Sequence, residues 1–372
     1  MMRKTFSFIL AACALTASAQ QSPTERFARF LTEPQHYVCQ RSVGILTIDG
    51  KLDEPAWQQA EPITHFVDIS GEGFPKPRYQ TTAKMLWDDN YLYVAAKLDD
   101  PHVWADLTER DAVVFYNNDF EVFIDPDGDG QNYFEIEVNA LANVFDLSIT
   151  RPYRSPHGTF VQFQWNCPGL QVATQVQGTL NDASDTDEGW TVEMAIPRKA
   201  LANDFGNVLQ AGKTLRLGFS RVEWQYEVDA NGKYSRKRNA DGKYLPEDNW
   251  TWGATGQIAM HMPERWGYLQ LSPTSCGQQP EAYRQPADAA ERHLLWALFY
   301  AQEESWQKHG RYMAKLKDFN LSKADLATLP EGATLQVEAT TRTFEVSVRY
   351  KDGGCLALDE DGCIYYTKAK NK

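Results

Sequence analysis

The chain between residues 41 and 275 is dominated by short segments in which apolar and polar residues alternate. The densest of them is residues 117–139, NNDFEVFIDPDGDGQNYFEIEVN. Residues 120–125 and 133–138 alternate, and the sequence DPDGDG between them is typical of a turn, since proline presets φ and glycine accepts positive φ. The pattern therefore predicts a β-hairpin that carries an unusual number of carboxylates.

Many further segments resemble this one, and few stretches show a helical period. Strands are expected at residues 82–87, 91–98, 143–149, 159–165, 170–180, 189–196, 215–224 and 267–271, and near 250–252. Short strands separated by turn residues favour a mainly β fold, an antiparallel β-sandwich over residues 41–275. A doubly wound α/β fold is disfavoured because the strands do not alternate with amphipathic helices.

The pattern changes after residue 276. Residues 289–309 place apolar side chains at helical spacing before Gly310, and strands are expected at 335–337, 343–350 and 355–366. Residues 276–372 are thus predicted to form a small C-terminal α+β appendix, in which Cys355 and Cys363 could pair across a hairpin. Residues 20–40 are polar and are expected to be an irregular lead-in.

The first 19 residues predict export. Arg3 and Lys4 precede an apolar run that ends Ala-Ser-Ala, which is typical of a signal peptide cleaved before Gln20. An alternative is a lipoprotein leader that leaves Cys13 as a lipid anchor. No later stretch approaches the ~20 apolar residues of a transmembrane helix. We therefore expect a secreted, periplasmic or cell-surface protein.

Charge and aromatic content narrow the possible partners. The formal net charge is −13, and it becomes −15 when Arg3 and Lys4 leave with the signal peptide. Such a chain should repel nucleic acid and anionic membrane surfaces. Its 11 Trp and 17 Tyr mostly serve packing, yet in an exported protein they also favour a surface on which sugars stack.

Several motifs resemble those of family 9 carbohydrate-binding modules and their standalone relatives, in the same order. They are TIDGKLDEPAW, LWDDNYLYVAAKLDDP, NNDFEVFIDPDGDG, FEIEVNA, GWTVEMAIP, LGFSRVEW and PERWGYLQL, spanning about residues 45–272. The resemblance implies a β-sandwich, saccharide binding linked to polysaccharide catabolism, and bound calcium. It also implies that two aromatic rings could grip the reducing-end sugar.

The resemblance also implies roles for particular residues. Glu121 matches a family position that hydrogen-bonds the sugar, and Tyr116, preferred over Phe115, matches a stacking aromatic. The position of the second stacking ring falls near Met260 and His261, so Trp250 and Trp252 could take that role. A ligand-contacting arginine is replaced by Glu137, and Arg221 could supply a cation instead.

Sugar hydroxyls both donate and accept hydrogen bonds, so a sugar site needs carboxylates, amides and an aromatic platform. The candidate ligand-binding residues are Tyr116, Asn118, Glu121, Glu137, Asn139, Arg221, Glu223, Trp250 and Trp252. With a period of two, Asp119 and Glu121 share one strand face, as do Glu135 and Glu137. The alternative interpretation is a solvated outer face of the sandwich.

Asp125, Asp127 and Asp129 alternate through the predicted turn and resemble a calcium loop, because hard cations bind clustered oxygen ligands. The pattern disfavours an EF-hand, since the distal glutamate and the flanking helices are absent from it. A structural calcium and a plain acidic turn remain as the two interpretations.

Two other function classes stay open. Paired carboxylates such as Glu121 and Glu137 could serve a glycoside hydrolase, whose two carboxyl groups lie about 5–9.5 Å apart. Haem binding through Met260, His261 or Met262 is a further alternative, without the Cys-x-x-Cys-His motif of covalent attachment. The sequence contains no nucleophile elbow, phosphate loop or zinc-type Cys-His spacing.

Overall fold

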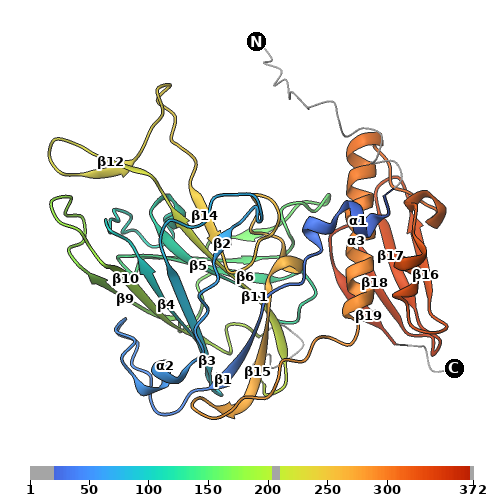
Figure 1. Cartoon of the computed structure of the whole chain (residues 1–372), viewed down its shortest axis with the longest axis horizontal. Helices are drawn as coiled ribbons and strands as arrows, with labels where there is room; N and C mark the ends of the chain where they lie inside the picture. The colour runs from blue at the N-terminus through green and yellow to red at the C-terminus, as the bar shows by residue number, and fades with distance from the viewer. Residues whose placement is uncertain (1–20, 203–209, 369–372) are drawn as a thin grey trace. The chain divides into compact units, whose positions relative to one another are not determined.

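The computed structural model describes residues 21–202 and 210–368 (Figure 1). The expected signal peptide and Cys13 lie outside these residues. The described residues divide into two compact units, a larger one within residues 33–285 with 361–363 and a smaller one of residues 21–32, 286–360 and 364–368. The larger unit begins before residue 41 and ends after 275, because residues expected as lead-in form its first strand.

One 13-stranded sheet makes up most of the larger unit, in the order β8-β7-β6-β5-β11-β15-β1-β3-β4-β10-β9, with β14 joining β11 and β2 joining β14. Its strands are β1 (His36–Arg41), β2 (Val67–Asp68), β3 (Thr81–Trp87), β4 (Tyr91–Asp99), β5 (Asp119–Asp125), β6 (Tyr133–Asn139), β7 (Val144–Ile149), β8 (Val161–Gln162), β9 (Gln171–Gln177), β10 (Gly189–Pro197), β11 (Thr214–Glu223), β14 (Asp248–Thr251) and β15 (Gly267–Ser275). The short elements around it are α2 (Pro55–Gln59), η2 (Val114–Tyr116), η3 (Pro263–Arg265) and the hairpin of β12 (Tyr226–Val228) and β13 (Tyr234–Arg236).

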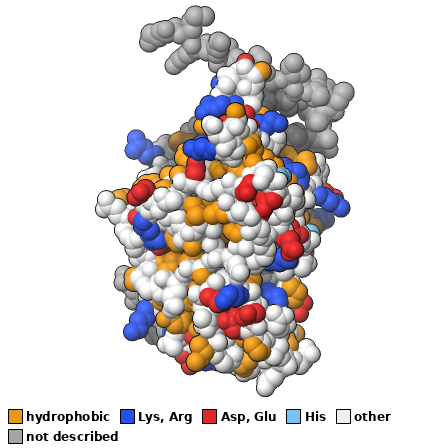
Figure 2. Space-filling view, turned by 90° about the vertical axis from the view of Figure 1, so that its left-hand side faces the viewer, with side chains coloured by type: hydrophobic (Ala, Val, Ile, Leu, Met, Phe, Trp, Pro, Cys, Tyr) orange, Lys and Arg blue, Asp and Glu red, His pale blue; other side chains and the backbone are white. Residues whose placement is uncertain are grey.

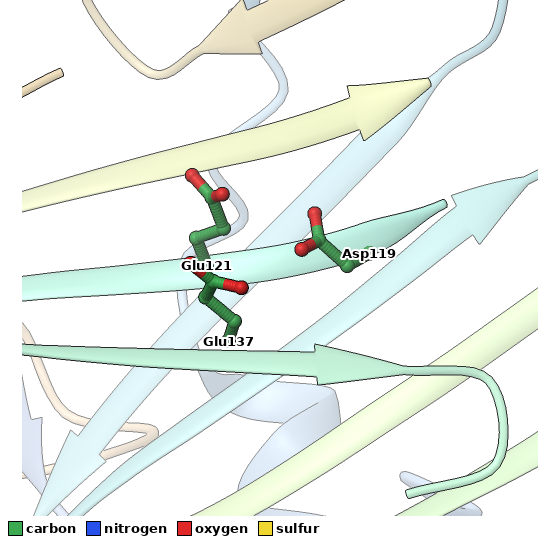
Figure 3. A group of neighbouring side chains, drawn as sticks. All are labelled: Asp119, Glu121 and Glu137. Carbon is green, nitrogen blue, oxygen red and sulfur yellow. The ribbon is translucent and has the colours of Figure 1, made fainter. Parts of the chain in front are cut away.

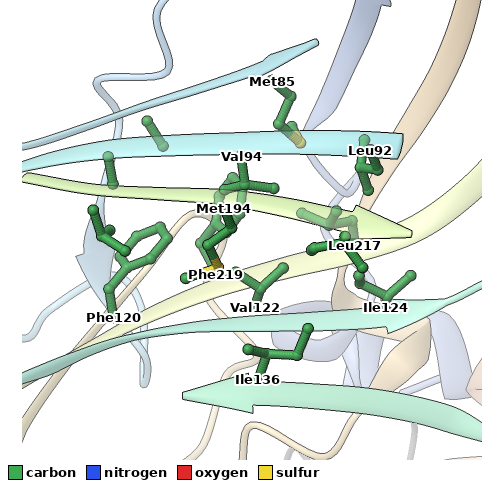
Figure 4. Close-up of a cluster of buried hydrophobic side chains, with 14 of the residues drawn as sticks. Met85, Leu92, Val94, Phe120, Val122, Ile124, Ile136, Met194, Leu217 and Phe219 are labelled. Atoms are coloured by element: carbon green, nitrogen blue, oxygen red, sulfur yellow. The ribbon is translucent and has the colours of Figure 1, made fainter. Parts of the chain in front are cut away.

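The sheet folds over so that two of its layers pack face to face. Apolar side chains of β3, β4 and β10 meet those of β5, β6 and β11 in one buried cluster (Figure 4). Val94 and Met194 from the first layer lie near Val122 and Phe219 from the second (Figure 4). The predicted mainly β sandwich is confirmed, and its core is the apolar half of each alternating strand.

One strand departs from the antiparallel prediction. β1 lies between β15 and β3 and is parallel to both, so the sheet is mixed. A tight hairpin cannot join parallel strands, and the long segment of residues 42–80 makes the crossover from β1 to β3. The sequence of β1 predicts a strand only weakly, because it contains just two buried apolar residues, Tyr37 and Cys39.

The smaller unit pairs one long helix with an antiparallel sheet, as the C-terminal sequence predicts. The sheet order is β16 (Thr334–Ala339), β17 (Phe344–Arg349), β18 (Cys355–Asp359) and β19 (Ile364–Thr367). The helix α3 (Ala289–His309) packs on β17 and β18 and ends at Gly310, whose φ is 65°. The remaining elements are α1 (Pro23–Arg26), η1 (Ala28–Phe30), η4 (Leu316–Phe319) and α4 (Lys323–Ala327).

Two details of the smaller unit differ from expectation. Residues 21–32 belong to it, and the rings of Phe30 and Tyr300 lie 4.9 Å apart between centroids. Cys355 lies opposite Thr367 in the β18–β19 register, whereas Cys363 immediately precedes β19, so the considered disulfide does not fit this hairpin. In the described part of the chain, no helix combines the length and apolarity needed to span a membrane.

Candidate functional site

The hairpin of β5 and β6 carries its carboxylates on the face turned away from the core. Phe120, Val122 and Ile136 lie in the core cluster, so their alternating neighbours point to the other side. On that side Glu121 lies directly opposite Glu137 of β6 and Ser220 of β11. The structure therefore confirms the acidic and apolar faces that alternation predicts.

Three carboxylates of this face converge. Asp119, Glu121 and Glu137 each offer one oxygen, and these oxygens all lie within 4.8 Å of one another (Figure 3). The three residues are 0%, 5% and 3% exposed. A solvated outer face, the alternative interpretation, is therefore wrong for this part of the sheet.

On the surface seen in Figure 2, acidic side chains occur in several separate groups.

Burial makes the acidic face electrostatically unusual. It raises the pKa of Glu121 to about 7, with the Ser220 hydroxyl opposing the shift. It also raises the pKa of Glu135 to about 8, and the charge of Glu121 adds to that effect. The pKa values of Asp119 and Glu137 lie well above the usual range, because burial and neighbouring carboxylates both favour the neutral acids.

Two segments outside the strands cover this face. The backbone N–H of Phe115 in η2 donates to Glu137 Oε2 at 3.0 Å. His261 Nδ1 lies 3.0 Å from the Tyr133 hydroxyl, and His261 Nε2 lies 3.9 Å from Glu135 Oε2. Because burial lowers the pKa of His261 to about 3, this imidazole is neutral near pH 7 and does not offset the carboxylate charge.

Gly218 explains how closely the covering loop approaches the sheet. A Cβ at this position of β11 would lie 2.7 Å from Met260 Cε and 2.8 Å from Trp266 Cδ1. The absence of a side chain thus lets residues 260–266 pack directly on the strand. The Met260–His261 region, where the resemblance implies a stacking ring, consequently forms part of the cover.

An aromatic cluster of Phe115, Tyr116 and Tyr244 lies beside the acidic face, and we call this region the rim. Tyr116 is 44% exposed, and its ring centroid lies 4.6 Å from that of Phe115. The guanidinium carbon of Arg236 in β13 lies 4.4 Å from the Tyr116 ring centroid and 4.1 Å from that of Tyr244. These distances are typical of cation–π contacts, so the β12–β13 hairpin contributes directly to the rim.

The predicted site residues Arg221, Glu223 and Trp250 point to the opposite face of the sheet. Arg221 lies opposite Phe120, a core residue, and opposite Trp250 of β14. Its guanidinium pairs with Glu223 at 2.9 Å. These residues therefore do not share a face with Glu121, because a one-residue offset in a strand reverses the direction of the side chain.

Both predicted tryptophans are packing residues in this structure. Trp252 belongs to the core cluster and is 3% exposed, with its ring centroid 5.7 Å from that of Phe219. Trp250 is also buried, against Tyr79 and the Arg221 guanidinium. Neither presents a ring face to solvent, so the expected second stacking platform is not found at these positions.

The two asparagines hold local structure. Asn118 donates to Glu223 Oε1 at 3.0 Å and accepts from the Trp224 backbone N–H at 2.8 Å. Asn139 accepts from the backbone N–H groups of Leu141 and Asn143 and thereby shapes the turn after β6. Their amides are engaged with the protein itself.

The aspartates of the β5–β6 turn lie together, as the sequence predicts. One carboxylate oxygen each from Asp125, Asp127 and Asp129 lies within 4.8 Å of the others. Asp125 is buried and accepts from the backbone N–H groups of Gly128 and Gly130, each at 2.9 Å. Burial, then Asp129 and Asp127, raise the pKa of Asp125 to about 8. The three side chains form an all-oxygen set of the kind that hard cations bind.

Comparison with known proteins places this sandwich in a family. The model of the carbohydrate family 9 binding domain-like family matches residues 48–273, more than half of the chain. The chain belongs to this family.

The curated relatives that this chain matches are much longer proteins. Endo-1,4-beta-xylanase A of Thermoanaerobacterium saccharolyticum is 25% identical over 192 residues, which are 52% of this chain and 14% of the relative. Exoglucanase XynX of Acetivibrio thermocellus is 26% identical over 216 residues, 58% of this chain and 16% of the relative. The chain thus spans only a small part of the length of these enzymes.

Two solved structures are similar to this chain at low sequence identity. A family 9 module from Caldicellulosiruptor kristjanssonii, in complex with cellotriose, is 16% identical with a TM-score of 0.40, covering 67% of this chain and 100% of that chain. A putative carbohydrate-binding protein from Bacteroides uniformis is 16% identical with a TM-score of 0.44, covering 64% of this chain and 100% of that chain.

The acidic face and its cover also contain residues outside the predicted set. Asp119, Glu135 and Ser220 lie on the acidic face, and His261 and the Phe115 backbone N–H lie over it. Alternation could have found the two carboxylates, since they share faces with Glu121 and Glu137. The strand register and the covering loop leave no comparable local signal for the others.

Proposed function

We propose that the larger unit binds a saccharide and serves polysaccharide catabolism. Membership of the carbohydrate family 9 binding domain-like family is the observation that carries this proposal. The exposed Tyr116 ring supports it, because an aromatic face packs well against the apolar face of a sugar. Tyr116 lies next to Phe115, whose backbone N–H donates to Glu137, so η2 links the exposed ring to the acidic face.

In this proposal the ring of Tyr116 stacks on the sugar, and Glu121 and Glu137 form hydrogen bonds with its hydroxyl groups. Raised pKa values allow these carboxyl groups to donate as well as accept hydrogen bonds near neutral pH. Sugar hydroxyls likewise both accept and donate hydrogen bonds. Calcium held by Asp125, Asp127 and Asp129 would fix the β5–β6 turn, which joins the two strands that present those carboxylates.

Isothermal titration with glucose, cellotriose and xylotriose tests the proposal. We expect Tyr116→Ala to weaken binding of any responsive sugar about tenfold, equivalent to ~1.4 kcal/mol, through loss of stacking. Phe74→Ala is the matched control, since Phe74 is another exposed aromatic of this unit. Equal affinity of both variants and wild type would place the site elsewhere, and a lack of binding to any tested glycan by wild type would overturn the function.

The hydrolase alternative makes a separate prediction. A glycoside hydrolase acting through Glu121 and Glu137 would release reducing sugar from a polysaccharide, and Glu121→Gln would abolish that release. A purely binding protein shows no release while retaining measurable affinity. Colorimetric reducing-sugar assays on xylan and cellulose therefore distinguish the two functions.

We also propose that the protein is exported. The basic start, the apolar run and the Ala-Ser-Ala sequence of the first 19 residues support a cleaved leader. N-terminal sequencing of mature protein should begin at Gln20, whereas a lipid-modified mature terminus at Cys13 would support the anchored form. An intact Met1 in protein from the native host would overturn both.

A further inference from the structure

The β12–β13 hairpin and the loop after it form a basic segment in an acidic chain. Residues 226–245 contain five lysines or arginines and three carboxylates, a formal charge of +2, whereas the whole chain carries −13. This segment reaches the rim, where Arg236 of β13 meets the Tyr116 ring. A local positive charge of this kind attracts anions that the rest of the molecule repels.

Three aromatic rings hold the Arg236 side chain in place. Its guanidinium carbon lies 4.1 Å from the ring centroid of Tyr244, 4.4 Å from that of Tyr116 and 4.7 Å from that of Trp224. Trp224 is itself fixed, because its indole N–H donates to the Phe115 carbonyl at 2.7 Å. A cation that is attracted to several rings loses little further freedom when it binds a ligand.

The donors of this guanidinium are free, although the side chain is half-buried. In the part of the chain that the structure describes, Arg236 forms no hydrogen bond through its side chain and no ion pair. None of its nitrogen atoms is both buried and unpaired, so its N–H groups are open to solvent. Arg238 differs, because it donates to the Gly242 carbonyl at 2.7 Å and to the Tyr244 hydroxyl. Arg236 therefore keeps its planar set of donors available for a ligand.

We propose that Arg236 makes the saccharide site selective for acidic sugars, by forming a two-point ion pair with a carboxylate or sulfate group of the glycan. This role of Arg236 rests on the proposed saccharide function. Two parallel N–H groups of a guanidinium match two oxygens of such a group, and these pairs are stronger than neutral hydrogen bonds. A nucleic acid is a poorer fit, because it needs several phosphate contacts and this segment has a formal charge of only +2.

The position of Arg236 lets one sugar contact both the ring and the charge. Tyr116 is 44% exposed even with the guanidinium against it, so part of its ring remains available for stacking. The acidic group of a uronic acid or a sulfated sugar projects from the edge of the pyranose ring, so a sugar stacked on Tyr116 brings that group within reach of the guanidinium. Burial raises the pKa values of Glu121 and Glu137, so these carboxyl groups hydrogen-bond more readily as neutral acids and repel a charged sugar less.

Isothermal titration of the full-length protein with sugar pairs that differ in the acidic group tests this role. The pairs are glucose with glucuronic acid, glucose with glucose 6-sulfate, and xylotriose with xylotriose that carries a glucuronic acid branch. We expect wild type to bind the acidic member of at least one pair about tenfold more tightly, because a charge-assisted pair adds to the contacts that both members share.

Variants of the hairpin separate the guanidinium from general charge. Arg236→Gln should reduce the preference to about twofold or less and leave the affinity for neutral sugars within about twofold of wild type, since only the charged pair is lost. Lys237→Gln is the matched control, because it removes the same charge from the exposed neighbouring residue and should keep the preference. Arg236→Lys should keep an intermediate preference, because the charge remains and the planar set of donors is lost.

Loss of the preference in Arg236→Gln but not in Lys237→Gln would support the role, and the pair with the larger preference would identify carboxylate or sulfate as the recognised group. Equal affinity of wild type for both members of every pair, or tighter binding of the neutral members, would overturn it and leave the saccharide function intact. An equal loss of neutral and acidic sugars in Arg236→Gln would also overturn it, since the arginine would then only hold Tyr116 in place. If wild type binds no tested sugar, the saccharide function fails and this role fails with it.

Discussion

Replacement of Trp252 by alanine separates a packing role from a ligand-binding role. Trp252 is 3% exposed, belongs to the main core cluster and packs against Phe219. Truncating a core tryptophan removes its transfer free energy and leaves a cavity, at a cost of about 3–5 kcal/mol. Since whole domains are stable by only about 5–15 kcal/mol, we expect a large fall in the free energy of unfolding.

Urea unfolding followed by far-ultraviolet circular dichroism measures this change for the transition of the larger unit. Tyr116→Ala is the comparison, because its half-exposed ring should contribute within about 0.5 kcal/mol to stability while affecting sugar affinity. The reasoning is refuted if Trp252→Ala leaves the urea midpoint unchanged and removes sugar binding. That result would show that Trp252 reaches the ligand in solution.

Three further predictions concern stability. Gly267→Ala should destabilise the larger unit by about 1–3 kcal/mol, since the new Cβ would lie 2.5 Å from Trp252 Cζ3; an unchanged thermal midpoint would contradict this packing. Leu298→Ala should cost the smaller unit about 2–5 kcal/mol, because Leu298 is fully buried in α3, and calorimetry should show its transition alone shifting. Burial raises the pKa of Glu223 to about 8 from 4.5, so the folded state holds a proton that the unfolded state releases. Stability from this group is therefore complete below pH 4.5 and is lost as pH rises toward 8, by up to about 1.4 kcal/mol per pH unit. Melting curves at pH 5, 6, 7 and 8 should be flatter for Glu223→Gln than for wild type, and parallel profiles would contradict the assignment.

The local pattern predicts the β5–β6 hairpin well. Alternation assigns Phe120 and Val122 to the core and Glu121 to the other face, because side-chain direction in a strand depends only on the local period of two. The same reasoning predicts the sandwich and the long C-terminal helix. These are properties of contiguous residues, and a sequence records them directly.

Relations between strands are a different matter. Within β11, Leu215, Leu217 and Phe219 are core residues, so the local period of two already places Arg221 on the core side. The register with β5, which sets Ser220 opposite Glu121, depends on pairing across the sheet and has no local signal. The parallel insertion of β1 was missed for the same reason, since its partners β15 and β3 lie elsewhere in the chain.

The acidic face shows why burial of a polar surface is the hardest feature to predict. An apolar face lowers the free energy of folding when it is covered, whereas covering Asp119, Glu121 and Glu137 removes carboxylates from water at a cost. Two processes can offset that cost, retention of protons or binding of a cation. They have opposite pH signatures: protonation stabilises less as pH rises, whereas cation binding strengthens as the ligands lose their protons. A calcium-induced rise in thermal midpoint that grows from pH 6 to pH 8 would therefore assign the covered face to the cation, whereas a midpoint that calcium leaves unchanged at every pH would assign it to protons.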